Sequence, residues 1–359
     1  MVDNQDTPSV EEFFAVDATP KTSPFAGPRC VIPDVHGDLG AITRSVNAGL
    51  SFLASEKPEI IFLGDVIDRG PHALPVLKYI SKLQTAGYTV STLIGNHEAM
   101  FLQCLYDLNT VNVLNWFRNG GVSTLRSLSL LTHVTLAESD WHKIETAFRT
   151  NDMPMAARAM RDSDYLIREM FLQLKNKKFI TDFLNSLQLC IQRERDLYVH
   201  AGFLPGFILS YSAENTWSEQ LNDQFKLALN DFMHPLKTSV SEMSFDEFLT
   251  VSSFRGGESV AGPLWADIND FSALTTFEIR LLVSLLRKIG CQRMVVGHCV
   301  FDSPKLLSLS DKKDWPVSML FLDCGISMSY PGTLDAQCLA VNASGDSFVI
   351  GASGNFVGA

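Results

Sequence analysis

The chain has 359 residues, of which 46% are hydrophobic and 19% charged, an ordinary globular balance with enough length for one large domain. With 29 basic and 40 acidic side chains its formal net charge is −11, which argues against partners that present phosphates, such as nucleic acids and anionic membranes. The acidic N-terminus lacks the apolar core of a signal peptide and no apolar run is as long as a membrane span, so we expect a cytoplasmic protein.

The first part of the chain predicts alternating strands and helices. Residues 1–26 are rich in Asp, Thr, Ser and Pro, and we expect a flexible tail before a single catalytic domain over 27–359. Asp38 can cap a helix that continues to about residue 53, and a second helix covers about 72–84. Short apolar runs that each stop at a polar cluster predict buried strands at 30–32, 60–63, 88–94, 197–199, 293–296 and 318–322. This alternation indicates an α/β fold with parallel strands.

The middle of the chain interrupts that rhythm. Residues 99–190 carry apolar stripes at helical spacing, and we expect a mostly helical insertion over the strand edge. Residues 206–254 show no clear period and remain unplaced. Residues 272–289 again have a helical pattern, and the stretch 336–356 predicts two short strands joined at Gly345.

Five polar clusters follow apolar runs. They are PDVHGD (33–38), GDVIDRG (64–70), GNHE (95–98), HAG (200–202) and GH (297–298). In an open α/β sheet ligands gather beyond the carboxyl ends of the strands, so five clusters at five such ends should converge on one place.

The donors in these clusters are carboxylates, imidazoles and an amide, without a thiolate. They are Asp34, His36, Asp65, Asn96, His200 and His298. Mixed oxygen and nitrogen donors suit manganese, iron or zinc. Six donors exceed one four-coordinate site but suit two ions that share a bridging carboxylate. Two such ions clamp both sides of an in-line phosphoryl displacement and make hydroxide available from a shared water near neutral pH.

In this order the blocks DVHGD, GDVIDRG, GNHE, HAG and GH resemble the signature of the phosphoprotein phosphatase family of calcineurin-like metallophosphoesterases, over about residues 29–335. The blocks NWFRNGG, RGGESVAGPLW and LDCGISMSYPG are most similar to the Shewanella-like protein phosphatases. The resemblance implies an α/β sandwich of central sheets flanked by helices. It also implies hydrolysis of phosphate monoesters, on phosphoproteins or small phosphoesters, by direct attack of a hydroxide that bridges two metal ions. Manganese is the first expectation for the ions, with iron or zinc as alternatives.

The resemblance also implies roles for individual residues. Asp34, His36 and Asp65 would hold the first ion, and Asp65 would bridge to a second ion that is held by Asn96, His200 and His298. Arg69 would grip the phosphate with its planar fork of donors, and His97 would protonate the leaving oxygen, oriented by Asp68. These three residues form the expected catalytic set, and Asn96 would also lie against the substrate.

Among the departures from the pattern of the relatives, one falls at a phosphate-binding position. They usually carry a second phosphate-binding arginine two residues after Trp265, where this chain has Asp267. Either Arg255 takes over that contact, or the site grips phosphate with one arginine.

Two other functions compete with a phosphomonoesterase. A hydrolase of dinucleoside polyphosphates, similar to diadenosine tetraphosphatases, is the main alternative, although its relatives tend to alter the DRG and GNHE blocks, which are intact here. A non-catalytic scaffold would require missing ligand residues, and none of the six is missing. The motifs do not distinguish phosphotyrosine from phosphoserine or phosphothreonine, and they leave the oligomeric state open.

Overall fold

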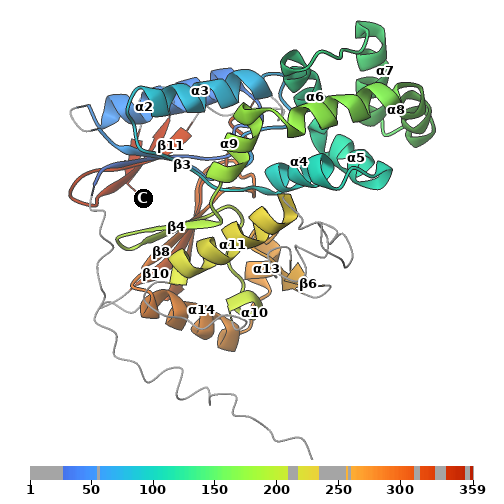
Figure 1. Cartoon of the computed structure of the whole chain (residues 1–359). Coiled ribbons are helices and arrows are strands. Elements are labelled where there is room, and N and C mark those ends of the chain that lie inside the picture. Colours follow the sequence, from blue (N-terminus) through green and yellow to red (C-terminus); the bar gives the residue numbers. More distant parts are fainter. Residues whose placement is uncertain are drawn as a thin grey trace, which may run out of the picture.

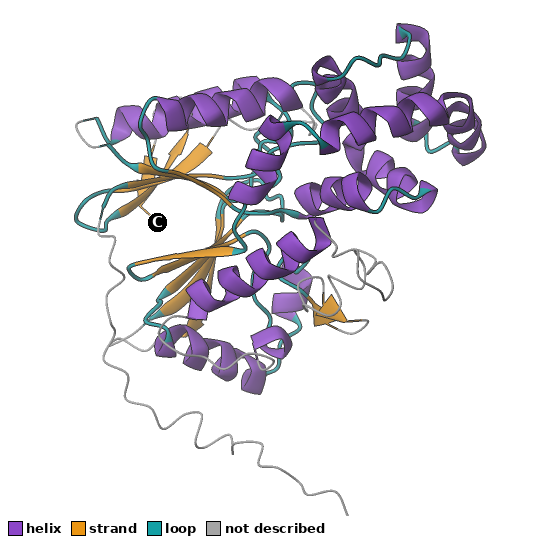
Figure 2. Cartoon of the chain, in the orientation of Figure 1, coloured by secondary structure: helices purple, strands orange, loops and turns teal. Residues whose placement is uncertain are grey.

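The computed structural model describes residues 27–54, 57–208, 217–233, 256–257, 260–310, 316–327, 337–351 and 356–358. Two β-sheets face each other at its centre, and helices lie on the outer side of each sheet (Figure 1, Figure 2). The expected N-terminal tail and Arg255 lie outside the described residues.

The first sheet has six strands in the order β13-β12-β11-β1-β2-β3. The strands β1, β2 and β3 are parallel, whereas β11 runs antiparallel to β1 and is followed by antiparallel β12 and β13. The two strands predicted on either side of Gly345 are β11 and β12. The bounds are β1 (Arg29–Ile32), β2 (Glu59–Phe62), β3 (Val90–Thr92), β11 (Gln337–Val341), β12 (Ser347–Gly351) and β13 (Phe356–Gly358).

The second sheet has five strands in the order β4-β5-β8-β10-β9. Its three central strands are parallel, and an antiparallel strand closes each edge. The edge strands were not predicted, because partly exposed strands such as β9 lack a continuous apolar run. The bounds are β4 (Cys190–Arg193), β5 (Asp196–Val199), β8 (Arg293–Val296), β9 (Lys305–Ser310) and β10 (Val317–Phe321); β6 (Gly256–Gly257) and β7 (Val260–Ala261) form a separate pair.

Apolar side chains fill the space between the sheets. This buried cluster takes members from both sheets and includes Val31, Ile61, Leu63, Leu93, Ile191, Tyr198, Val295, Leu320, Leu322, Leu339 and Val341. The other faces of the same strands pack against helices in a second, larger cluster. Because the central strands are buried on both faces, they appear in the sequence as unbroken apolar runs.

Helices cover both outer faces (Figure 1). The helices α2 (Leu39–Phe52) and α3 (Ala73–Thr85) lie on the first sheet, and α10 (Pro205–Ile208), α11 (Trp217–Met233), α13 (Ile268–Ser272) and α14 (Thr276–Lys288) lie with the second. The predicted start of α2 is confirmed, because the Asp38 carboxylate accepts a hydrogen bond of 3.0 Å from the backbone N–H of Ala41. The helix α11 falls in the stretch that the sequence left unplaced.

Between β3 and β4 the chain is helical. The elements are α4 (Asn96–Tyr106), α5 (Thr110–Trp116), the π-helical turn η1 (Phe117–Gly121), α6 (Val122–Leu128), the 3-10 turn η2 (Ser129–Leu131), α7 (Glu138–Arg149), α8 (Met153–Lys175) and α9 (Lys178–Ser186). Figure 1 shows that α5 to α8 project beyond one end of the two sheets. Among the described helices, none combines the length and the apolar character that crossing a membrane requires. The predicted α/β class, with two sheets flanked by helices, is confirmed.

Candidate metal centre

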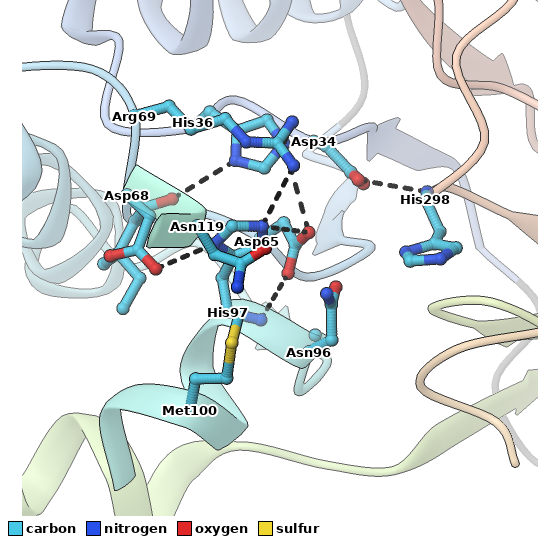
Figure 3. A network of polar contacts seen from close by, with 12 residues as sticks. Asp34, His36, Asp65, Asp68, Arg69, Asn96, His97, Met100, Asn119 and His298 are labelled. Carbon is cyan, nitrogen blue, oxygen red and sulfur yellow. Dashed lines mark hydrogen bonds and ion pairs between the residues drawn. The ribbon is translucent and has the colours of Figure 1, made fainter. Parts of the chain in front are cut away.

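The polar clusters meet at the carboxyl ends of the parallel strands of both sheets. In the first sheet, Asp34 and His36 follow β1, Asp65 follows β2, and Asn96 begins α4 just after β3; in the second, His200 follows β5 and His298 follows β8. Two of the contacts between the sheets join predicted ligand residues to each other. The Asp34 carboxylate accepts a 3.0 Å hydrogen bond from the His298 backbone, and Asn96 Oδ1 lies 3.1 Å from His200 Nε2. All six predicted ligand residues therefore surround one place, and Figure 3 shows four of them around Asp65 and His97.

The backbone of the site is strained. Seven described residues other than glycine have a positive φ, and five of them belong to the site: His36, Asp65, Asp68, Arg69 and His298. Such conformations cost about 1–3 kcal/mol each and persist where the surrounding structure enforces them. Their concentration here marks this edge of the sheets as a functional site.

Asp65 is the centre of the cluster. Its Oδ2 lies 3.6 Å from His200 Nε2, 3.8 Å from His97 Nε2 and 4.0 Å from His36 Nε2. Ligand atoms within 4.8 Å of one another form two groups of three, one of Asp65 with His36 and His97, the other of Asp65 with His200 and His298. Burial alone would raise the pKa of Asp65, but the surrounding imidazoles lower it overall. Asp65 is thus an ionised carboxylate that both groups share.

Two of the histidines are oriented from behind by backbone carbonyls. His200 Nδ1 lies 2.9 Å from the carbonyl oxygen of Leu63, and His36 Nδ1 lies 3.4 Å from that of Ile67. A carbonyl only accepts hydrogen bonds, so each Nδ1 carries the proton and each Nε2 keeps its lone pair. The lone pair of His36 Nε2 accepts from Arg69 Nη1 at 3.1 Å. Burial is the largest cause that lowers the pKa of both rings, and it keeps them in the neutral form that binds metals.

Asn96 brings a further acceptor into the same space. With its nitrogen turned toward Asp65 and His200, the Asn96 amide donates to Asp65 Oδ2 at 3.0 Å and to His200 Nε2 at 3.1 Å. With its oxygen turned toward them, it offers a lone pair to the same space. The amide therefore lies where it could act as a ligand beside Asp65 and His200.

Two buried carboxylates add to the negative charge. Asp34 Oδ1 and Asp323 Oδ2 are buried, and within the described part of the chain neither has a hydrogen-bond partner. Burial raises the pKa of both groups, that of Asp323 to about 7, and their mutual repulsion raises that of Asp34 further. A cation nearby would offset this charge. Asp323 follows β10 and was not predicted, although its signal was the same as for the others, a polar residue at the end of an apolar run.

His97 and Asp68 form a tight buried pair. His97 Nδ1 lies 2.7 Å from Asp68 Oδ2, and both side chains are essentially inaccessible to solvent. Burial lowers the pKa of His97, but the carboxylates of Asp65 and Asp68 more than reverse this and raise it overall. His97 Nε2 then faces Asp65 Oδ2 and the Arg69 guanidinium, whose Nη2 lies 3.2 Å away (Figure 3). The guanidinium only donates, so Nε2 has its lone pair in this arrangement and is the ring atom at which His97 can take up a proton at the edge of the cluster.

Glu98 supports the loops behind the ligands. Its fully buried carboxylate accepts hydrogen bonds from four backbone N–H groups, those of Asp65 and Gly95 at 2.9 Å, Val66 at 2.9 Å and Ile67 at 3.3 Å. Burial and the neighbouring Asp65 raise its pKa to about 8, which the donated hydrogen bonds oppose. Glu98 thereby ties the turn after β2 to the start of α4.

Residues 28–236 match the sequence family described as calcineurin-like phosphoesterase, which is more than half of the chain. The chain belongs to the calcineurin-like phosphoesterase family. This confirms the family resemblance and the class of enzyme, a phosphoester hydrolase. The phosphoesterase is 25% identical to the serine/threonine-protein phosphatase BSL2 of Arabidopsis thaliana over 158 residues, which are 42% of this chain but 13% of that protein.

Solved structures show the same fold. A cold-active protein tyrosine phosphatase determined at 1.1 Å matches 97% of this phosphoesterase and 82% of its own chain, with a TM-score of 0.57 and 16% sequence identity. The cold-active protein-tyrosine phosphatase of a psychrophilic Shewanella species matches with a TM-score of 0.53 and 17% identity, over 97% of this chain and 84% of that one. The expected similarity to Shewanella phosphatases is confirmed at the level of the fold.

The phosphoesterase differs from the expected pattern at the second arginine position. Asp267 caps α13, since its carboxylate accepts hydrogen bonds of 2.6 Å and 3.1 Å from the backbone N–H groups of Asn269 and Asp270. Capping of α13 is therefore a structural role that explains an aspartate at position 267. Arg69, by contrast, reaches the cluster, with Nη1 3.1 Å from His36 Nε2.

Proposed function

We propose that this phosphoesterase hydrolyses phosphate monoesters of phosphoproteins with two metal ions held at the shared carboxylate of Asp65. The observation that carries the proposal is that Asp65 belongs to two groups of potential ligands, one with His36 and His97 and the other with His200 and His298. For the first ion we assign Asp34 in place of His97, which serves in proton transfer. A single ion would leave one of these groups without a cation. Two ions that share one carboxylate suit the in-line displacement of a phosphoryl group.

The proposed ligands follow the positions of the strands. Asp34, His36 and Asp65 come from the first sheet and would hold one ion. Asp65 and three residues around its other side, Asn96, His200 and His298, would hold the second. The unpartnered, buried carboxylate oxygen of Asp34 supports this set. The chemistry of the donors suits manganese, with iron or zinc as alternatives.

When bound, the two ions lower the pKa of a shared water and offset the charge of the phosphate. Arg69 binds the phosphate through two guanidinium nitrogens, a geometry that matches two oxygens of one phosphate. Asn96 lies beside the same space and adds an amide to it. The predicted contact from Arg255 remains a proposal.

His97 serves as the general acid. Hydrolysis breaks the bond between phosphorus and the leaving oxygen and joins an oxygen of water to phosphorus. His97 donates the proton on Nε2 to the leaving oxygen. It regains a proton from solvent, into which the attacking water on the opposite side of phosphorus has released one. Asp68 holds the ring through Nδ1 at 2.7 Å and stabilises its protonated form.

A phosphoprotein substrate is supported by the proteins to which this chain is similar, which are named as tyrosine phosphatases and as a serine/threonine phosphatase. A site built from two ions, an arginine and an acid contacts only the phosphate and the leaving oxygen. Either type of ester fits this chemistry, so we propose activity on both.

The test is hydrolysis of p-nitrophenyl phosphate with added manganese and after chelation, followed by a panel of phosphopeptides. Turnover should need the metal and should be abolished by Asp65→Asn. In His97→Ala it should fall about 10²- to 10⁴-fold on phosphoserine peptides, whose leaving oxygen needs a proton, and much less on p-nitrophenyl phosphate. The control is His133→Ala, at an exposed position of the helical region, which should match the wild type. A folded protein that binds two ions but hydrolyses no phosphomonoester would refute the proposal and direct attention to dinucleoside polyphosphates.

A further inference from the structure

The helical region between β3 and β4 holds the loop that carries Asp68 and Arg69 at three points. The indole N–H of Trp116 donates to Asp68 Oδ2 at 2.7 Å. The backbone N–H of Asp68 donates to Thr124 Oγ1 at 2.8 Å, and that of Arg69 donates to the carbonyl of Gly120 at 3.1 Å. These contacts join residues about fifty positions apart in the sequence and come from α5, η1 and α6, which pack beside one another.

The most informative of these contacts is that of Trp116, because it reaches the same oxygen of Asp68 that contacts His97. Asp68 Oδ2 accepts hydrogen bonds from both the Trp116 indole and His97 Nδ1, each at 2.7 Å, while Oδ1 has no partner among the described residues. An indole N–H can only donate, and a donated hydrogen bond favours the ionised form of Oδ2. With Oδ2 as a carboxylate acceptor, His97 presents Nδ1–H to Asp68, and Nε2 is left facing the site.

The position of the indole is fixed by its surroundings. Trp116 is fully buried, and its ring lies 5.2 Å from that of Phe101 and 5.8 Å from that of Phe171. A Cβ on Gly121 would come within 2.3 Å of the indole. Gly120 has a φ of 103°, and a Cβ there would lie 2.7 Å from the backbone nitrogen of Arg69. The Gly-Gly pair thus lets η1 approach both the indole and the arginine.

We propose that Trp116 is a positioning residue for proton transfer, which acts through Asp68 to fix the tautomer and direction of His97. The inference rests on the proposed function, since it assigns His97 the role of general acid. Through Trp116, the helical region then contributes to proton transfer. Trp116 itself acts on Asp68 and does not contact the substrate. The variant Trp116→Phe removes the N–H and keeps an aromatic ring, and Trp141→Phe is the matched control, because Trp141 is an equally buried indole on α7.

The kinetic test compares leaving groups. A substrate that leaves as a weak base, such as p-nitrophenyl phosphate, needs little protonation, whereas phenyl phosphate and phosphoserine peptides need it in the transition state. Trp116→Phe should lower kcat on phenyl phosphate about tenfold to a hundredfold, within the contribution of a general acid. The loss on p-nitrophenyl phosphate should be several times smaller, KM should stay nearly constant, and Trp141→Phe should affect both substrates equally.

A second comparison separates positioning from general damage. In a His97→Ala background the substitution Trp116→Phe should cause no further loss, because the residue it positions is gone. Equal losses on both substrates, or an additional loss in the His97→Ala background, would overturn the inference.

Proton NMR of the metal-free protein tests the contact independently of activity. The chain has five tryptophans, so indole labelling gives five N–H signals at most. The Trp116 signal, assigned by its loss in Trp116→Phe, should exchange slowly with solvent and should move in Asp68→Asn. A Trp116 signal that exchanges rapidly with solvent and keeps its chemical shift in Asp68→Asn would overturn the inference. An inactive wild type with the expected signal would refute the proposed function while leaving the hydrogen bond established.

Discussion

Substitution of Glu98 by glutamine should destabilise the fold although it changes only one atom. The carboxylate accepts from two backbone N–H groups on each oxygen, those of Asp65 and Gly95 on one and those of Val66 and Ile67 on the other. A glutamine amide can accept on its oxygen only, so its NH₂ group would face two N–H donors. Each buried donor left without a partner costs about 1–3 kcal/mol, so Glu98→Gln should lower the free energy of unfolding by about 2–6 kcal/mol.

The assay is urea unfolding of the metal-free protein, followed by circular dichroism, at a pH above the Glu98 pKa of about 8 so that the carboxylate is ionised. The control is Glu138→Gln, since the Glu138 side chain is 80% exposed and its ion pair with Arg126 should contribute less than about 1 kcal/mol. Many domains are stable by only about 5–15 kcal/mol. The loss in Glu98→Gln should therefore clearly lower the urea concentration at the midpoint of unfolding. A change smaller than about 1 kcal/mol, equal to that of the control, would refute the assignment of Glu98 as the tie between these loops.

Three further outcomes follow from the structure. Asp267→Ala should cost about 1 kcal/mol in urea unfolding through loss of the α13 cap and Asp267→Asn much less, whereas equal costs would contradict the capping role. Gly120→Ala should cost about 1–3 kcal/mol and also reduce turnover, because it forces a residue at positive φ against the Arg69 backbone; a fully active, stable variant would contradict this. Manganese at a hundred times its Kd should stabilise the protein by about 2.7 kcal/mol. Its affinity should fall as the pH is lowered below neutrality, because burial and the neighbouring Asp323 and Asp65 raise the pKa of Asp34 and protons then compete with the metal. A pH-independent affinity would contradict this.

The ends of the central strands were predictable because their signal is local. A strand buried on both faces is an unbroken apolar run, and the first polar residues after it, such as Asp65 and His200, lie at the sheet edge whatever the rest of the chain does. The helix that begins after Asp38 was predictable for the same reason, since a cap involves residues three apart.

The remaining features depend on contacts between distant segments. Trp116 lies on a helix with an apolar stripe, where a buried aromatic is the ordinary expectation, and only the folded chain brings its N–H to Asp68. The helix α11 was missed although Leu221, Phe225 and Leu229 are buried at a spacing of four, because the flanking polar residues gave no clear start. The relative placement of the two sheets likewise follows from packing and not from local pattern.

The central claim is that Asp65 serves two metal ions at once, and metal stoichiometry tests it most directly. Wild-type protein, stripped with chelator and titrated with manganese in a calorimeter, should bind two ions per chain. Asp65→Asn should weaken both binding events together, because the carboxylate lies in both groups, whereas His298→Ala should weaken one and spare the other. One ion per chain in the wild type, or an Asp65→Asn variant that loses a single site and keeps the other unchanged, would contradict the account.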